Sequence, residues 1–91
     1  MRRVFDARIR KVGNSYVVTM PSIIIRRFKL KQGDFLTVSV DLKKIQREFD
    51  SRIRKVGNSY VITIPPVTVK RFGLKEGSFI TVDVELEKHA K

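Results

Sequence analysis

The chain has 91 residues and no cysteine, and its 20 Lys and Arg against 9 Asp and Glu give a formal net charge of +11. The absence of cysteine excludes a disulfide framework and a thiolate metal site. Hydrophobic residues make up 42% of the chain, which is enough for a packed core and argues against disorder. A thermophilic type of surface would explain the charged content but not its sign, so the positive excess points to a polyanionic partner.

Two further classes are disfavoured by the distribution of apolar residues. No apolar run is long enough to span a membrane, and no signal peptide precedes the first strand-like segment. We therefore expect a cytoplasmic protein, nucleoid-associated if it binds DNA, with no membrane partner. The charge is uneven: residues 1–44 hold 11 Lys and Arg against 3 acids, and residues 45–91 hold 9 against 6, giving +8 and +3.

The sequence is a tandem duplication with a constant offset of 44 residues. The segment 11–17 recurs unchanged at 55–61, and Pro21 corresponds to Pro65 with no insertion between the copies. Two copies are too few for a solenoid. We expect one pseudo-twofold domain made of repeats 1–44 and 45–88, followed by a frayed tail at 89–91.

The first predicted element is a half-buried strand over residues 4–12. Phe5, Ala7 and Ile9 fall on one face of it, and the arginines between them fall on the other. The alternation slips at residues 11–12, where we expect the strand to end in a bulge or turn. Gly13 and Asn14 follow, and both residue types tolerate the positive φ of a tight turn.

A short strand at residues 16–20 is expected next, and Tyr16 is expected to pack in the core or at its rim. Pro21 ends this strand and suits the first turn of a helix. We predict that helix at residues 22–28, although its isoleucine run alone would favour a strand. The second copy supports the helix, since Pro65 and Pro66 start it, Phe72 ends it and Gly73 is a good C-cap.

The clearest strand lies at residues 35–42, where Leu36, Val38 and Val40 alternate with polar residues, and it recurs at residues 79–86. The junction 43–54 contains no Pro or Gly, so we expect extended structure that runs directly into the next copy. Each copy therefore reads β-β-α-β. A fourth strand is missing after Leu86, and the segment before Ala7 is expected to supply it. The fold class predicted is mainly β with two short helices, arranged as a pseudo-twofold closed β-barrel.

These residues resemble the AbrB/MazE/SpoVT superfamily of DNA-binding proteins. The resemblance rests on residues 10–15, on a strand ending in Met20-Pro21 and on residues 30–35, and all three features recur in the second copy. It implies a swapped-hairpin or related cradle-loop barrel, with RIFT and double-psi strand crossings left open. It also implies a sequence-selective DNA-binding protein, a transcriptional regulator of AbrB type that binds duplex DNA without a cofactor or small-molecule substrate. A homodimer of barrels is compatible with it.

The family's DNA contacts come mainly from the first strand, the Gly-Asn turn and helix arginines. Carried over by position, with Arg8 and Arg52 added because they share the strand face of Arg10 and Arg54, the expected DNA-binding residues are Arg8, Arg10, Lys11, Asn14, Ser15, Arg26, Arg27, Arg52, Arg54, Lys55, Asn58, Ser59, Lys70 and Arg71. The helix cations match only loosely, within one residue. Members of the antitoxin branch often carry Arg two residues before the proline, where this chain has Thr19 and Thr63.

Three alternatives are weighed against a DNA-binding regulator. An enzyme is disfavoured, because the chain has one His, no metal-spaced cluster and no paired carboxylates suited to acid–base work. An antitoxin of a toxin–antitoxin pair is less favoured, because the five residues after Leu86 are too few for a wrapping tail. A protein-interaction barrel that does not bind DNA also stays open.

The two hairpin loops are identical in sequence but are expected to differ in function. If each loop lies near its own copy's charges, the first loop should contribute more to DNA binding, because the first half carries +8 and the second +3. A swapped arrangement of the copies would reverse that order.

Overall fold

The computed structural model describes residues 2–42 and 44–86. The first copy forms β1 (Arg2–Arg8), β2 (Arg10–Val12), β3 (Ser15–Thr19), α1 (Ser22–Phe28) and β4 (Phe35–Leu42). The second copy forms β5 (Ile45–Arg52), β6 (Arg54–Val56), β7 (Ser59–Ile64), α2 (Pro66–Phe72) and β8 (Phe79–Leu86). Both predicted helices and the predicted strands at 35–42 and 79–86 are confirmed.

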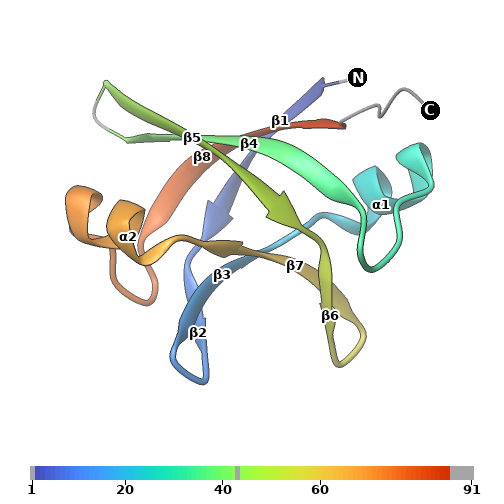
Figure 1. Cartoon of the computed structure of the whole chain (residues 1–91), viewed down its shortest axis with the longest axis horizontal. Helices are drawn as coiled ribbons and strands as arrows, with labels where there is room; N and C mark the ends of the chain where they lie inside the picture. The colour runs from blue at the N-terminus through green and yellow to red at the C-terminus, as the bar shows by residue number, and fades with distance from the viewer. Residues whose placement is uncertain (1, 43, 87–91) are drawn as a thin grey trace.

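The strands form two four-stranded antiparallel sheets, which lie at the top and bottom of Figure 1. The upper sheet has the order β1-β8-β4-β5, and the lower sheet has the order β2-β3-β7-β6. Each sheet takes two strands from each copy, and the central pairs β4–β8 and β3–β7 join equivalent strands of the two copies. Strand β1 pairs with β8, so the segment before Ala7 does supply a fourth strand to this sheet, as expected.

The chain passes from the upper sheet to the lower sheet at Ile9 in the first copy and at Ile53 in the second. Ile9 donates its N–H to the carbonyl of Ser78 at 2.7 Å and accepts the N–H of Gly77 at 2.8 Å. Ile53 makes the equivalent bonds with Asp34 and Gly33. The prediction of one strand that slips at residues 11–12 is therefore wrong. The strand breaks at Ile9, because its backbone groups bond to a turn of the other copy instead of to the ladder.

The junction between the copies also differs from the prediction of a continuous extended segment. Strands β4 and β5 form a hairpin in which Leu42 faces Ile45. Lys44 in its turn has a φ of 69°, a conformation that costs a non-glycine residue roughly 1 kcal/mol. Lys43 and the predicted tail at 89–91 lie outside the described residues.

The hydrophobic core lies between the two sheets. It is made of fully or almost fully buried side chains: Leu36, Val38, Val40, Ile80, Val82 and Val84 from the upper sheet, with Val18, Met20, Ile62 and Ile64 from below. The inward faces predicted for β4 and β8 are therefore confirmed. Each such side chain contributes about 1.5–3 kcal/mol relative to an exposed one.

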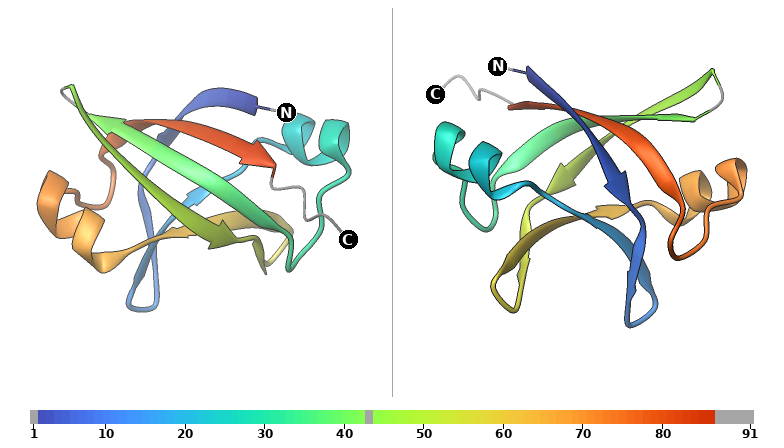
Figure 2. Two further views of the ribbon diagram at one scale, coloured as in Figure 1. Left: turned by 45° about the horizontal axis from the view of Figure 1, so that its top comes forward. Right: turned by 180° about the vertical axis from the view of Figure 1, so that it is seen from behind.

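Each helix packs against the other copy, with α1 on β7 and α2 on β3 (Figure 2). Gly73 ends α2 in the left-handed conformation, as predicted, and Lys29 takes the same conformation after α1. Each helix has seven residues, and no helix in the described part of the chain is long and apolar enough to cross a membrane.

Candidate nucleic-acid interface

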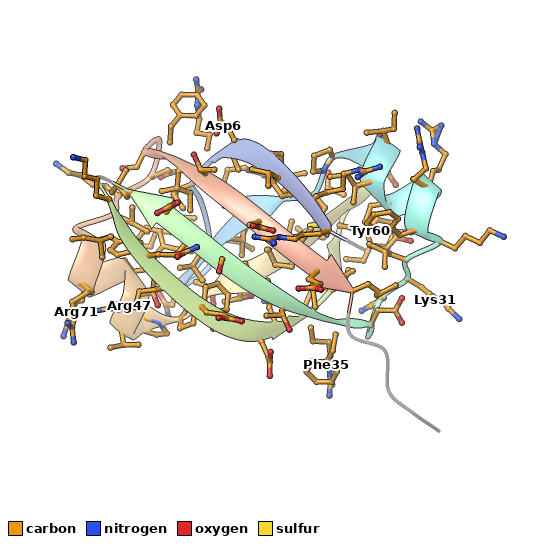
Figure 3. All side chains as sticks on the ribbon, turned by 90° about the horizontal axis from the view of Figure 1, so that it is seen from above. Asp6, Lys31, Phe35, Arg47, Tyr60 and Arg71 are labelled. Carbon is orange, nitrogen blue, oxygen red and sulfur yellow. The ribbon has the colours of Figure 1, made fainter. Side chains whose placement is uncertain are left out.

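Charge is segregated between the two sides of the molecule. The outer face of the upper sheet, seen from above in Figure 3, carries six of the chain's nine acidic residues. They are Asp6, Asp41, Glu48, Asp50, Asp83 and Glu85. Residues 9–33 and 53–75, which form the lower sheet and both helices, contain no acid and hold six and five Lys or Arg. A polyanion is therefore attracted more strongly to the lower side than to the upper face, where the acids lie on the same sheet face as Arg2, Arg8 and Arg52.

Two hairpins project from the lower side of the molecule, and the outer face of the lower sheet between them is called the arch (Figure 1). The first hairpin is β2–β3 and the second is β6–β7, and the strands β3 and β7 pair to form the roof between them. Gly13 and Gly57, in the two turns, each have a φ of 60°. No atom would meet a Cβ within 4 Å at either position, so the backbone angle rather than a lack of space favours glycine there.

Arg10 and Arg54 lie on the arch face of the lower sheet. Nη1 of Arg10 donates to Oγ1 of Thr19 at 3.2 Å, and Nη1 of Arg54 donates to Oγ1 of Thr63 at 3.4 Å. The guanidinium groups are thus held across the sheet by neutral acceptors, and within residues 2–42 and 44–86 neither of them forms an ion pair. The other donors on each planar fork stay available for phosphate or a base edge.

Beneath these arginines lie two valines that do not belong to the main core. Val17 stands between Arg10 and Thr63 in the register, and Val61 stands between Arg54 and Thr19. Both valines are fully buried although they point away from the space between the sheets. Each arginine is thus the cross-strand neighbour of a buried valine, a position from which an aliphatic stem can cover apolar surface while its charged end faces solvent.

Lys11 and Lys55 lie on the opposite face of their hairpins from the arch arginines. Nζ of Lys11 is 5.7 Å from the centroid of the Tyr16 ring, and Nζ of Lys55 is 5.6 Å from that of Tyr60. Both tyrosines are partly buried against the core, which confirms the expectation of core or rim packing. The two lysines extend the positive charge around the outer sides of the hairpins.

Arg8 and Arg52 do not join the arch. The strand break places Arg8 on the upper sheet, where its guanidinium carbon is 4.8 Å from the centroid of the Phe79 ring. Arg52 stacks likewise on Phe35 at 4.7 Å. The prediction that Arg8 and Arg10 share one strand face is corrected, because the two side chains lie on different sheets.

The helix cations separate into two groups. Arg26 of α1 lines a groove of about 560 Å³ with Asn58 and Ser59 of the second hairpin. Lys70 of α2 lines a groove of about 230 Å³ with Asn14 and Ser15 of the first hairpin. Each hairpin tip is thus flanked by the helix of the other copy.

The other two helix cations, Arg27 and Arg71, follow Arg26 and Lys70 in the sequence. Arg27 lines a different groove, of about 280 Å³, together with Arg3 and Val4 of β1. Arg71 is exposed near the end of α2 (Figure 3). Neither residue lines a groove beside a hairpin tip.

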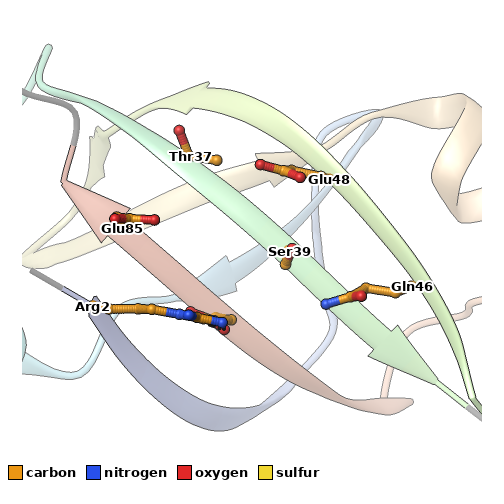
Figure 4. A pocket seen from close by; sticks show the side chains of 7 residues that line it. Arg2, Thr37, Ser39, Gln46, Glu48 and Glu85 are labelled. Atoms are coloured by element: carbon orange, nitrogen blue, oxygen red, sulfur yellow. Dashed lines mark hydrogen bonds and ion pairs between the residues drawn. The ribbon is translucent and has the colours of Figure 1, made fainter.

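The upper face has a shallow polar hollow of about 310 Å³ (Figure 4). Glu48 and Glu85 line it, with Arg2 at one side in a bidentate ion pair with Asp83, at distances down to 2.7 Å. The hydrogen bond and charge of Asp83 raise the pKa of Arg2 above its usual value. A phosphate group would meet carboxylates here, so this hollow is unsuited to nucleic acid.

Two features of the site were missed at the level of sequence. Thr19 and Thr63 accept hydrogen bonds from the arch arginines. A hairpin around the Gly-Asn turn pairs Arg10 with Val17, and this register could have indicated that Thr19, two residues further on, lies beside Arg10. The placement of each helix beside the hairpin of the other copy has no local sequence signal, because it depends on how the two copies interlock.

A family model described as antidote-toxin recognition MazE, bacterial antitoxin, matches residues 9–45 and again residues 53–88. The chain belongs to this family. The two matched regions reproduce the tandem arrangement of the sequence, with one MazE-type unit in each copy. Thr19 and Thr63 stand where antitoxin-branch members often carry Arg, and here they accept hydrogen bonds from Arg10 and Arg54.

A solved structure is similar to this chain over almost the whole length of both proteins. It is the solution structure of PHS018 from Pyrococcus horikoshii, which has a TM-score of 0.72 and 21% sequence identity, with 97% of this chain and 94% of that chain covered. At this identity the likeness supports the fold alone. No curated protein matches the chain.

Proposed function

We propose that this MazE-family protein binds duplex DNA through the arch and acts as a sequence-selective transcriptional regulator of AbrB type. The observation that carries the proposal is the pairing of an acid-free arch, bearing Arg10 and Arg54, with an acidic face on the other side of the molecule. This polarity leaves DNA one favourable side to approach.

Both the arch and the hairpin tips would contact DNA. Arginine and lysine side chains meet phosphate oxygens and fix the register, whereas Asn and Arg also read base edges. Asn14 and Asn58 stand exposed at the tips of the two hairpins. Because the hairpins are related by the pseudo-twofold, each would contact one half of a site, as in other twofold DNA-binding proteins.

We further propose that the two sheets close into one barrel in which residues 1–44 and 45–88 are inseparable halves. All strand pairs except β2–β3 and β6–β7 join the two copies. Such interlocking holds both hairpins in one rigid frame. That rigidity keeps their spacing constant, which a fixed half-site spacing on DNA requires.

We predict that binding to duplex DNA depends strongly on salt. If about six to eight phosphates are neutralised, log K against log salt should have a slope of roughly −5 to −7. Fluorescence anisotropy with a pool of random-sequence duplexes, between 50 and 300 mM salt, measures this slope. A flat slope, or no binding at the lowest salt, contradicts the proposal and favours a protein-interaction barrel.

A second candidate function is recognition of a toxin, which the description of the matching family favours. The groove beside Arg27 offers a surface for it, because Val4 and Ile23 there are 59% and 58% exposed. Co-purification of a tagged chain from its own host would test this function. It is compatible with DNA binding, since this groove is distinct from those at the hairpin tips.

A further inference from the structure

The two hairpins of the arch are identical in sequence, but their surroundings differ. Residues 8–17 and 52–61 carry the same side chains, so any difference between the two ends of the arch comes from the residues that surround the hairpins. Because the copies interlock, the first hairpin lies beside α2 and the second lies beside α1. The helices differ where they line the grooves, with Ser22 and Arg26 on α1 against Pro66 and Lys70 on α2.

These differences change the hydrogen bonds that each groove can form with a base edge. Arg26 presents a planar fork that can bond guanine O6 and N7 together, and the Ser22 hydroxyl adds a second donor and acceptor. Lys70 is a flexible point charge, and Pro66 has neither a backbone N–H nor a polar side chain. The groove beside Arg26 is also the larger, at about 560 Å³ against about 230 Å³.

We infer that the DNA site consists of two unequal half-sites, so that the chain binds it in one orientation. This inference rests on the proposed function. The half-site that contacts α1 and the second hairpin is recognised sequence-specifically, with a guanine opposite Arg26. The half-site under α2 and the first hairpin is held mainly through phosphates. A homodimer with identical halves would have no such polarity.

Which of the two hairpin loops has the more positive surroundings also depends on the fact that each loop lies beside the helix of the other copy. The expectation that the first loop is favoured assumed that each loop lies near its own copy's charges, and the structure contradicts that assumption. Residues 22–34, beside the second loop, hold four Lys and Arg and one acid, whereas residues 66–78, beside the first, hold three and one. The second loop therefore lies in the slightly more positive surroundings.

Selection of bound sites from random duplex DNA tests the inference, with wild type, Arg26→Lys, Lys70→Arg and the double exchange. All four proteins carry the same net charge, so non-specific affinity should stay constant. Wild type should select a site with one strongly specified half. A guanine preference of about fivefold to hundredfold in that half should be lost in Arg26→Lys. The double exchange should move that preference to the other half, which reverses the orientation of the chain on the selected site and is read by tethered cleavage.

Orientation is read directly by tethered cleavage, because the chain has no cysteine of its own. Ile23 and Val67 are equivalent positions on α1 and α2, with exposures of 58% and 66%. Each is changed to cysteine and coupled to a DNA-cleaving iron chelate. Cleavage from position 23 should fall at the specified end of the selected site, and cleavage from position 67 at the other end.

The control is Lys31→Arg with Lys75→Arg, at equivalent exposed turn positions outside the grooves. It should leave the selected site unchanged. A palindromic site, or equal cleavage of both ends from each label, overturns the inference while the proposed function stands. If wild type enriches no sequence and binds no duplex at low salt, the proposed function itself fails.

Discussion

Replacing Arg10 and Arg54 together by glutamine should weaken binding to duplex DNA by between about 30-fold and 10⁴-fold. Loss of a charge-assisted arginine contact to a phosphate or a base edge costs roughly 1–3 kcal/mol, and two such losses are expected here. The salt slope should also become shallower by about 2, because two cations are removed. Anisotropy titration of one labelled duplex at three salt concentrations measures both effects.

Glutamine is chosen because Arg10 and Arg54 are the cross-strand neighbours of Val17 and Val61, which are fully buried. Alanine would expose those valines, so a loss of DNA affinity could not be separated from a loss of folding stability. The matched control is Glu48→Gln with Glu85→Gln on the opposite face. It should change affinity by less than about twofold, because the molecule measures 29 Å along its middle axis and the Debye length is about 8 Å.

The outcome of this comparison decides where DNA lies. A loss below about threefold in the arginine variant, with the salt slope unchanged, would remove the arch from the interface. A larger effect from the glutamate variant than from the arginine variant would place the nucleic acid on the upper face instead.

Residues 1–44 expressed alone should fail to fold as a monomer. Separation from the second copy removes every partner of β1 and β4 and leaves β2–β3 as the one strand pair, with three and five residues. An isolated two-stranded hairpin is marginally stable at best. The inward faces of β4 and α1 would also be left uncovered. We therefore expect either an unfolded chain or self-association that rebuilds the missing pairs.

Sedimentation and amide NMR spectra of the fragment, compared with those of the full chain, test this expectation. An unfolded fragment gives poorly dispersed amide signals, and a rebuilt pair sediments as a dimer. A monomeric fragment with dispersed signals would contradict the interlocked arrangement. Residues 45–91 provide the matched fragment, because they keep β6–β7 in the same way.

The local elements could be predicted from the sequence because their signals are local. Pro21 and Pro65 mark the helix starts, Gly73 marks a helix end, and the alternation around Val38 identifies a strand and its buried face. The break at Ile9 could not be predicted, since a buried isoleucine fits an uninterrupted strand equally well. Its cause is a pair of hydrogen bonds to Gly77 and Ser78, which are distant in sequence.

The same distinction applies to the candidate site. Arg10, Asn14 and their counterparts in the second copy are proposed as DNA-binding residues from the family resemblance, and the structure places them on two neighbouring hairpins. The separation of Arg8 from Arg10 follows from the strand break and was not foreseeable. The approach of Arg26 to Asn58 depends on which copy's helix covers which hairpin, and two identical motifs cannot encode that choice locally.

Mapping DNA onto the folded chain by NMR tests the central claim most directly. The full chain, labelled with ¹⁵N, is titrated with a short duplex at low salt, and amide shift changes are followed residue by residue. Binding through the arch predicts changes at the hairpin tips and arch, including Asn14, Asn58, Thr19 and Thr63, with Ser39 and Gln46 of the upper face unaffected. Changes concentrated on the upper face, or none at all, would contradict it.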